Sequence, residues 1–88
     1  HPVTKRIQAH LGVDFELPIG SPVYASQRGI ILRKGYQRAA GNFIVIRHPN
    51  GLETYYNHLQ RIESKIRPGH RVKSGEKIGT IGCTGYCT

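Results

Sequence analysis

Two side chains near the N-terminus, His10 and Asp14, are of types that bind zinc. They are four positions apart, and Asp14 is the only aspartate in the chain. Four steps of an extended strand span about 13 Å, so both donors would reach one ion only if the chain bends. Gly12, which lies between them, allows such a bend. Taken alone, the pattern more often means an exposed histidine and an aspartate that caps a turn.

A third residue of interest, His58, follows a run of β-branched and aromatic residues. At the end of a strand an imidazole can project into a cleft as a general acid or base. The alternative is a half-buried histidine that packs on an aromatic ring. His48 and His70 adjoin turn residues, and we predict that both lie on the solvated surface. The single aspartate leaves few Ser-His-Asp arrangements, and neither Cys83 nor Cys87 lies in a recognisable catalytic context.

The elements that must position these residues are predicted to be strands. Eleven glycines and five prolines interrupt the chain at short intervals, and no helical period is sustained over about ten residues. We therefore predict one all-β domain over residues 1–88, an antiparallel sheet of short strands and hairpins. The predicted strands are residues 13–17, 23–25, 30–32, 43–46 and 52–56 and two tight strands within 66–82, with a turn at 18–22 and a loop at 35–41.

The strongest local signal is the Asn-Gly pair at residues 50–51, which lies between two runs of β-branched and aromatic residues. It predicts a hairpin with a type I′ turn, because both central residues of that turn need positive φ. Counting outward from this turn pairs Val45 with Tyr56 and Phe43 with His58. Side chains alternate along a strand, so His58 would share a face with Tyr56.

The chain is strongly basic, with 13 Lys and Arg residues against 5 Asp and Glu and a formal net charge of +8. Such a charge attracts polyanions, for example nucleic acid, anionic lipid or an acidic cell-wall polymer. The cations are scattered, which is typical of a solvated surface. No apolar run reaches the roughly 20 residues of a membrane span. No signal peptide stands at the start, and the absence of Met indicates a piece excised from a longer protein.

Cys83 and Cys87 are the two cysteines of the chain. Two are too few for a disulfide scaffold, and no second pair exists that would complete a structural zinc site. In an oxidising compartment they could bridge a small loop, and in a reducing one they would remain thiols. The spacing leaves both states open.

Several segments, taken in order along the chain, form a more specific pattern than any one of them. They are residues 1–3 (HPV), 10–15 (HLGVDF), 18–25 (PIGSPVYA), 29–31 (GII), 41–48 (GNFIVIRH), 50–59 (NGLETYYNHL), 68–79 (PGHRVKSGEKIG) and 82–85 (GCTG). This series resembles the lysostaphin-type (LytM-like) zinc endopeptidases, metallopeptidase family twenty-three, which cut peptide cross-bridges in bacterial cell walls. The resemblance extends over nearly the whole chain.

The resemblance implies a LytM-like (duplicated-hybrid-motif) core and a zinc ion held by His10, Asp14 and a third ligand from a His-x-His strand. In such enzymes zinc lowers the pKa of a bound water and polarises the scissile carbonyl. His58 is expected to act, with the first histidine of that strand, on the water and the tetrahedral intermediate. Family members continue into Gly-Pro-His-Leu-His where this chain stops. We therefore expect that the 88 residues lack the third ligand and the C-terminal strand, and that alone they are inactive or poorly folded.

Three other functions stay open at this point. A degenerate LytM-like domain would bind and activate a cell-wall amidase, but such domains tend to lose their metal ligands, and this chain keeps His10, Asp14 and His58. A small basic β-barrel would bind nucleic acid through charge and aromatic stacking, but the tyrosines at 55–56 would point to opposite faces. A lipoyl- or biotinyl-type carrier is suggested by residues 72–79, which have no lysine at the expected tight turn.

The partners and location follow from the resemblance. It implies peptidoglycan stem peptides and cross-bridges as substrates, an anionic wall polymer as a possible further partner of the basic surface, and no nucleic acid. It also implies the cell envelope, periplasmic or extracellular, as the location. Pairing of the cysteines would slightly favour an oxidising periplasm and a Gram-negative-type cross-link.

Overall fold

The computed structural model describes residues 4–8 and 14–83 of the chain. All regular elements in these ranges are strands, and they contain no helix that could cross a membrane. The strands are β1 (Thr4–Gln8), β2 (Asp14–Pro18), β3 (Pro22–Tyr24), β4 (Gly29–Gln37), β5 (Gly41–Arg47), β6 (Glu53–Ile62), β7 (Arg71–Val72) and β8 (Lys77–Ile81).

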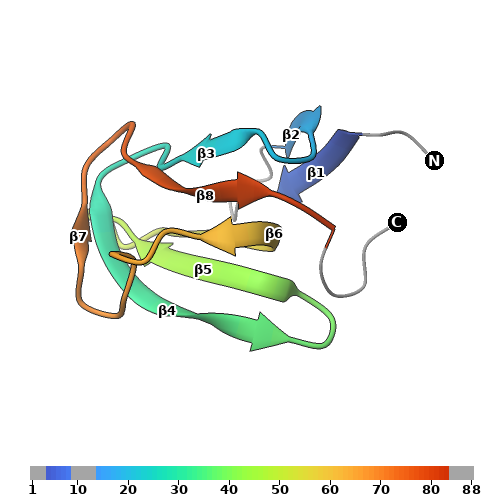
Figure 1. The fold of residues 1–88 in the computed structure, drawn as a ribbon. Coiled ribbons are helices and arrows are strands. Elements are labelled where there is room, and N and C mark those ends of the chain that lie inside the picture. Colours follow the sequence, from blue (N-terminus) through green and yellow to red (C-terminus); the bar gives the residue numbers. More distant parts are fainter. Residues whose placement is uncertain (1–3, 9–13, 84–88) are drawn as a thin grey trace.

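Six strands form one curled antiparallel sheet, and β1 and β2 form a separate hairpin (Figure 1). The order in the sheet is β3-β8-β6-β5-β4-β7. Backbone hydrogen bonds join the end of β3 to the turn between β7 and β8: the Gly75 N–H donates to Ala25 O (2.8 Å), and the Ala25 N–H donates to Glu76 O (2.8 Å). The prediction of an all-β antiparallel fold is confirmed.

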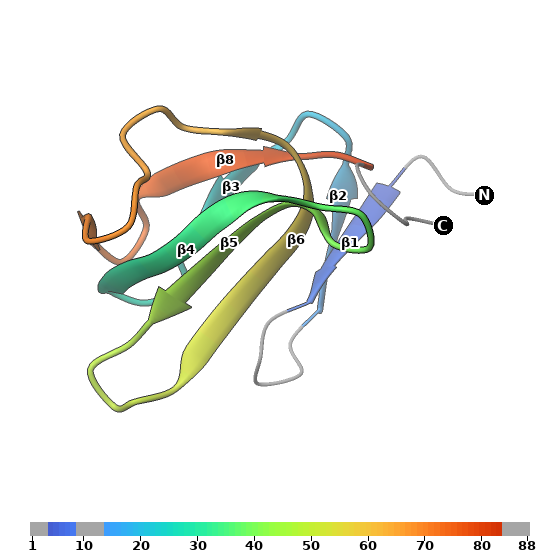
Figure 2. The same cartoon turned by 90° about the horizontal axis from the view of Figure 1, so that it is seen from below.

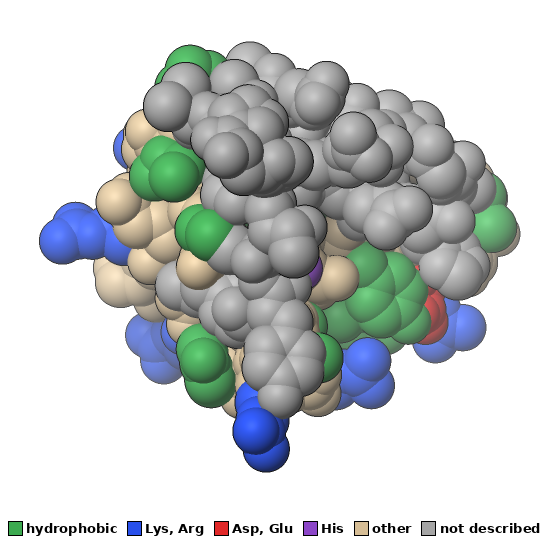
Figure 3. Space-filling view, turned by 90° about the vertical axis from the view of Figure 1, so that its right-hand side faces the viewer, with side chains coloured by type: hydrophobic (Ala, Val, Ile, Leu, Met, Phe, Trp, Pro, Cys, Tyr) green, Lys and Arg blue, Asp and Glu red, His purple; other side chains and the backbone are tan. Residues whose placement is uncertain are grey.

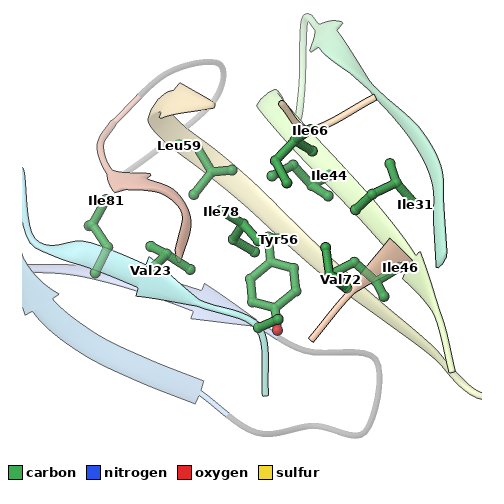
Figure 4. Close-up of a cluster of buried hydrophobic side chains, with 11 residues drawn as sticks. Val23, Ile31, Ile44, Ile46, Tyr56, Leu59, Ile66, Val72, Ile78 and Ile81 are labelled. Carbon is green, nitrogen blue, oxygen red and sulfur yellow. The ribbon is translucent and has the colours of Figure 1, made fainter. Parts of the chain in front are cut away.

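The inside of the curl holds the hydrophobic core (Figure 4). Its buried members are Val23, Ala25, Ile31, Ile44, Ile46, Tyr56, Leu59, Ile66, Val72, Ile78 and Ile81. Tyr56 is the largest of the fully buried side chains, and its hydroxyl accepts a hydrogen bond from the Ser26 N–H (3.1 Å). Burial of apolar surface is the main favourable term in folding, so this cluster decides which face of each strand points inward.

The hairpin between β5 and β6 has a three-residue turn, and the predicted type I′ turn is wrong. The Gly51 N–H donates to the carbonyl three positions earlier (2.9 Å), and Gly51 has positive φ (87°) while Asn50 does not. Proline precedes Asn50, and its fixed φ suits the first central position of a type I turn that a left-handed glycine then closes. The pairing shifts by one residue, so Val45 pairs with Tyr55 and not with Tyr56.

Two other elements differ from the prediction. β4 continues through most of the segment 35–41, which we predicted as a loop, because Gly35 pairs with Phe43 and Gln37 pairs with Gly41. β1 was not predicted, although it pairs with β2 along its whole length. Its sequence, TKRIQ, contains a single apolar residue, so no alternation of apolar and polar residues reveals it.

Glu76 stabilises the turn that precedes β8. One carboxylate oxygen accepts from the Lys73 N–H (2.9 Å), and the other lies 3.0 Å from His70 Nε2 and 3.1 Å from Lys65 Nζ. The Lys73 hydrogen bond, then the His70 and Lys65 interactions, lower the pKa of Glu76 to about 2. The prediction of a solvated His70 is therefore wrong, since this side chain is half buried and bonded to Glu76.

We expect Glu76 to make the fold sensitive to acid. Its pKa is lower in the folded chain than its ordinary value of 4.5, so its stabilising contribution is complete above about pH 4.5 and is lost as the pH falls towards 2. Glu76→Gln should therefore flatten the fall in the free energy of unfolding over this range, measured by urea denaturation. Glu63→Gln is the control, because its ion pair with Lys77 is longer (3.8 Å). Equal slopes for wild type and Glu76→Gln would contradict this expectation.

Candidate functional site

His58 lies at a bulge in the middle of β6. Tyr56 and Leu59 are both in the core, although strict alternation would place residues three positions apart on opposite faces. β6 therefore has an extra residue here: Ile44 pairs with Tyr56, but Asn42 pairs with Leu59. The predicted pair of Phe43 with His58 is not formed, because both residues lie at this shift, although the extra residue restores the predicted count at the next pair, Asn42 with Leu59. His58 is not part of the core cluster that contains Tyr56.

The backbone of His58 is in the left-handed region, with a φ of 59°. No other non-glycine residue of the described ranges has positive φ. This conformation costs a residue with a Cβ atom about 1–2 kcal/mol, and such strain is concentrated at functional sites. The His58 N–H donates to Ala40 O (2.7 Å) in the turn between β4 and β5, which holds the bulge in place. The half-buried imidazole thus projects from a fixed point of the sheet.

The face of the sheet opposite the core carries a polar network on the same strand. Glu53 and Tyr55 of β6 pair with Arg47 and Val45 of β5, and these four alternate with core residues. The Tyr55 hydroxyl donates to the Glu53 carboxylate (2.7 Å), and this hydrogen bond is the main reason why the pKa of Tyr55 is raised. Arg33, which pairs with Val45, acts in the opposite direction. The phenol therefore remains protonated at neutral pH and can donate a hydrogen bond.

The predicted zinc ligands belong to the hairpin of β1 and β2. Asp14 is the first residue of β2 and pairs with Gln8, while His10 lies outside the described residues. β1 lies against β6, the strand that carries His58 (Figure 2). Within the described ranges no group of three His, Cys, Asp or Glu side chains could hold a metal ion. Zinc binding by His10 and Asp14 therefore stays a prediction.

His48 is buried, and the prediction that it lies on the solvated surface is wrong. Only 5% of the residue is exposed. Nδ1 lies 2.8 Å from Arg28 O and must donate to it, which leaves Nε2 to accept from the Thr54 hydroxyl. Both ring nitrogens are thus occupied: Nδ1 joins the turn between β5 and β6 to the loop before β4, and Nε2 joins this turn to β6. The role of His48 is structural.

Cys83 follows β8 and is disulfide-bonded. Cys87 is the other cysteine of the sequence and lies outside the described residues. Of the two states that the spacing leaves open, the structure therefore has the oxidised one at Cys83.

Comparison with known families and sequences gives a consistent result. The family model described as Peptidase family M23 matches residues 8–88. The peptidoglycan DD-endopeptidases ShyC and ShyA of Vibrio cholerae serotype O1 are each 44% identical over 88 residues, which is 100% of this chain and 20% of each relative. The chain thus spans about one fifth of the length of these curated relatives.

Solved structures with the same fold include two peptidases. A zinc-containing peptidase from Vibrio cholerae matches with a TM-score of 0.79 and 40% identity, over 90% of this chain and 24% of that one. The catalytic domain of lysostaphin from Staphylococcus simulans matches with a TM-score of 0.75 and 35% identity, over 82% of this chain and 54% of that one. The curled antiparallel sheet is therefore shared with both.

The strained backbone at His58 predicts an unusual order of stability among variants. His58→Gly should have a free energy of unfolding about 1 kcal/mol higher than His58→Ala, because glycine adopts positive φ without the Cβ penalty. His58→Asn should lie between them, since asparagine tolerates this region better than alanine. Urea denaturation of the three variants measures the differences.

Gln60, an exposed residue of the same strand without positive φ, provides the matched control. There the order should reverse, with Gln60→Ala more stable than Gln60→Gly, because glycine weakens an ordinary strand position. A His58→Gly variant less stable than His58→Ala would show that residue 58 is not strained.

Proposed function

The chain belongs to peptidase family M23, and from this we propose that it forms part of a zinc-dependent endopeptidase that hydrolyses peptide cross-links of bacterial peptidoglycan. Relatives named as peptidoglycan DD-endopeptidases support the substrate, and a solved neighbour named as a zinc-containing peptidase supports the metal. The structural observation that carries the proposal is the left-handed backbone of His58, because folding alone gives no reason to place a histidine there.

In this proposal His10 and Asp14 hold the zinc ion. Imidazole and carboxylate are the donor types of catalytic zinc sites, which combine three protein ligands with an open position. The third donor would come from the His-x-His strand that the resemblance implies. When bound, zinc supplies a water of lowered pKa and polarises the scissile carbonyl.

His58 would exchange protons with the attacking water and with the tetrahedral intermediate. A neutral imidazole can accept a proton, and an imidazolium can stabilise an oxyanion. Either role requires a ring that does not move away during the reaction. The bulge meets this requirement, since the hydrogen bond to Ala40 O fixes the backbone from which the ring projects.

We infer that the substrates are stem peptides and cross-bridges and that the protein works in the cell envelope, periplasmic or extracellular. Disulfides persist in oxidising compartments, so the disulfide-bonded Cys83 supports this location. The DD-endopeptidase relatives favour a cross-link that involves D-amino acids over a glycine bridge.

Two alternatives predict different outcomes of one set of measurements. A degenerate LytM-like domain that activates an amidase would share the family and the fold but would not bind zinc stoichiometrically. A basic barrel that binds nucleic acid would have no reason to hydrolyse muropeptides. Family membership counts against nucleic-acid binding, and zinc content and muropeptide cleavage separate an active hydrolase from a degenerate domain of the same family.

The test is cleavage of cross-linked muropeptides by the protein at its natural length. We expect zinc-dependent turnover that falls about 10²–10⁴-fold in His58→Ala, because general acid–base catalysis contributes an effect of this size. Zinc content, measured by elemental analysis, should stay near one ion per chain in His58→Ala and should fall in Asp14→Ala. Lys34→Ala, an exposed site on β4, is the control and should match wild type. Full activity in His58→Ala, or no zinc in the wild type, would contradict the proposal.

A further inference from the structure

Cations are spread over the surface but converge at one groove. On the face shown in Figure 3, Lys and Arg side chains project at separate points, and acidic atoms are visible at one place. A groove of about 660 Å³ lies beside the turn between β5 and β6. The residues that form this basic groove include Arg28, Ile30, Arg47, Pro49, Arg71 and Lys73. No acidic residue of the described ranges lines it.

Strand pairing brings residues of the basic groove into one row. Arg71 of β7 pairs with Ile30 of β4, Ile30 pairs with Arg47 of β5, and Arg47 pairs with Glu53 of β6. Directly paired residues share a face of a sheet, so the row crosses the face opposite the core. Ile30 is 41% exposed, and its apolar side chain lies between the two arginines on the surface.

The positive charge of the basic groove is not neutralised by the described part of the chain. Ion pairs there are centred on Glu76 and Glu63, and none involves a cation of the groove. Glu53, at the end of the row, accepts the hydrogen bond of Tyr55 (2.7 Å). Glu53 neighbours Arg47 across the two strands but forms no ion pair with it, so an anion that enters the groove meets guanidinium groups that no carboxylate of the described residues already binds.

The backbone around the basic groove is held rigidly. The buried ring of His48 binds Arg28 O, which ties the loop before β4 to the turn of the next hairpin. A Cβ atom on Gly29 would collide with the backbone carbonyl of Arg47, so β4 and β5 approach closely at this point. The positions from which Arg28 and Arg47 project are thus set before any ligand binds, which lowers the entropy cost of binding.

We propose that the basic groove binds the free carboxylates of a peptidoglycan stem peptide whose scissile bond lies at His58. This inference rests on the proposed function. Guanidinium groups bind carboxylates in a bidentate manner. The exposed side chain of Ile30 between them can contact the aliphatic part of a peptide. Four extended steps, about 13 Å, lead along β6 from Glu53, at the end of the row, to Asn57 beside the bulge that carries His58, and an extended peptide of about four residues spans this distance.

The test compares binding of a soluble cross-linked dimer of disaccharide-tetrapeptides with binding of the same molecule after amidation of its carboxylates. The protein at its natural length is used as the His58→Ala variant, so that turnover during titration calorimetry is about 10²–10⁴-fold slower. In this background, Arg47→Gln/Arg71→Gln should weaken binding of the carboxylate form about tenfold, and less at high salt. The amidated form should bind more weakly and should not respond to the double substitution.

Lys34→Gln/Arg61→Gln is the matched control, since it removes two positive charges from exposed positions that do not line the groove. It should change the affinity less than twofold. Equal effects of the two double variants would overturn the proposal, because the peptide would then sense only net charge. Equal affinity for the amidated and free forms would overturn it as well.

A phosphate polymer is the competing occupant, and a glycerol-phosphate oligomer of equal charge is its probe. Tighter binding of this oligomer than of the peptide, with loss in Arg47→Gln/Arg71→Gln, would overturn the proposal and assign the groove to phosphate. Muropeptide cleavage by the protein with His58 intact tests the proposed function separately from the assignment of the groove. If that protein cleaves muropeptides while the groove variants bind normally, only the groove assignment fails.

Discussion

The buried pairing of β5 with β6 determines where the side chains of both strands lie. Ile44 pairs with Tyr56 inside the curl, and this directs Val45 and Tyr55 to the opposite face. A slip by one residue would turn Ile44 and Tyr56 out of the curl, so the core accepts a single register beside the turn. Apolar burial therefore positions the polar network and the basic groove, although neither belongs to the core.

The sequence predicts the fold class and most strands, because Gly and Pro spacing and apolar runs act locally. It does not predict the register beside the turn of the central hairpin, since Pro49 lengthens the turn by one residue and shifts the pairs between the turn and the bulge. The bulge is also hidden, because it depends on Leu59 reaching a core that only the folded sheet creates. His48 was misplaced for the same reason: its partner Arg28 is twenty positions away.

The residues of the site differ in how far the sequence reveals them. His10, Asp14 and His58 are recognisable because a family resemblance connects them, whereas their spacing alone permits ordinary turn and surface roles. The cations of the basic groove look scattered because Arg28 and Arg71 are far apart in the chain, and the order of strands in the sheet is what assembles them. Charges that are distant in the chain come together only through the strand order, so no local sequence pattern predicts the groove.

The left-handed backbone at position 58 also bears on how such a gene changes over generations. Under selection for folding alone, substitutions to glycine would accumulate there, since they relieve the backbone at no cost to the core. If the proposed function holds, a lineage that keeps histidine does so because it needs the imidazole ring. A related domain with glycine at this position would then be expected to keep the fold without catalytic activity.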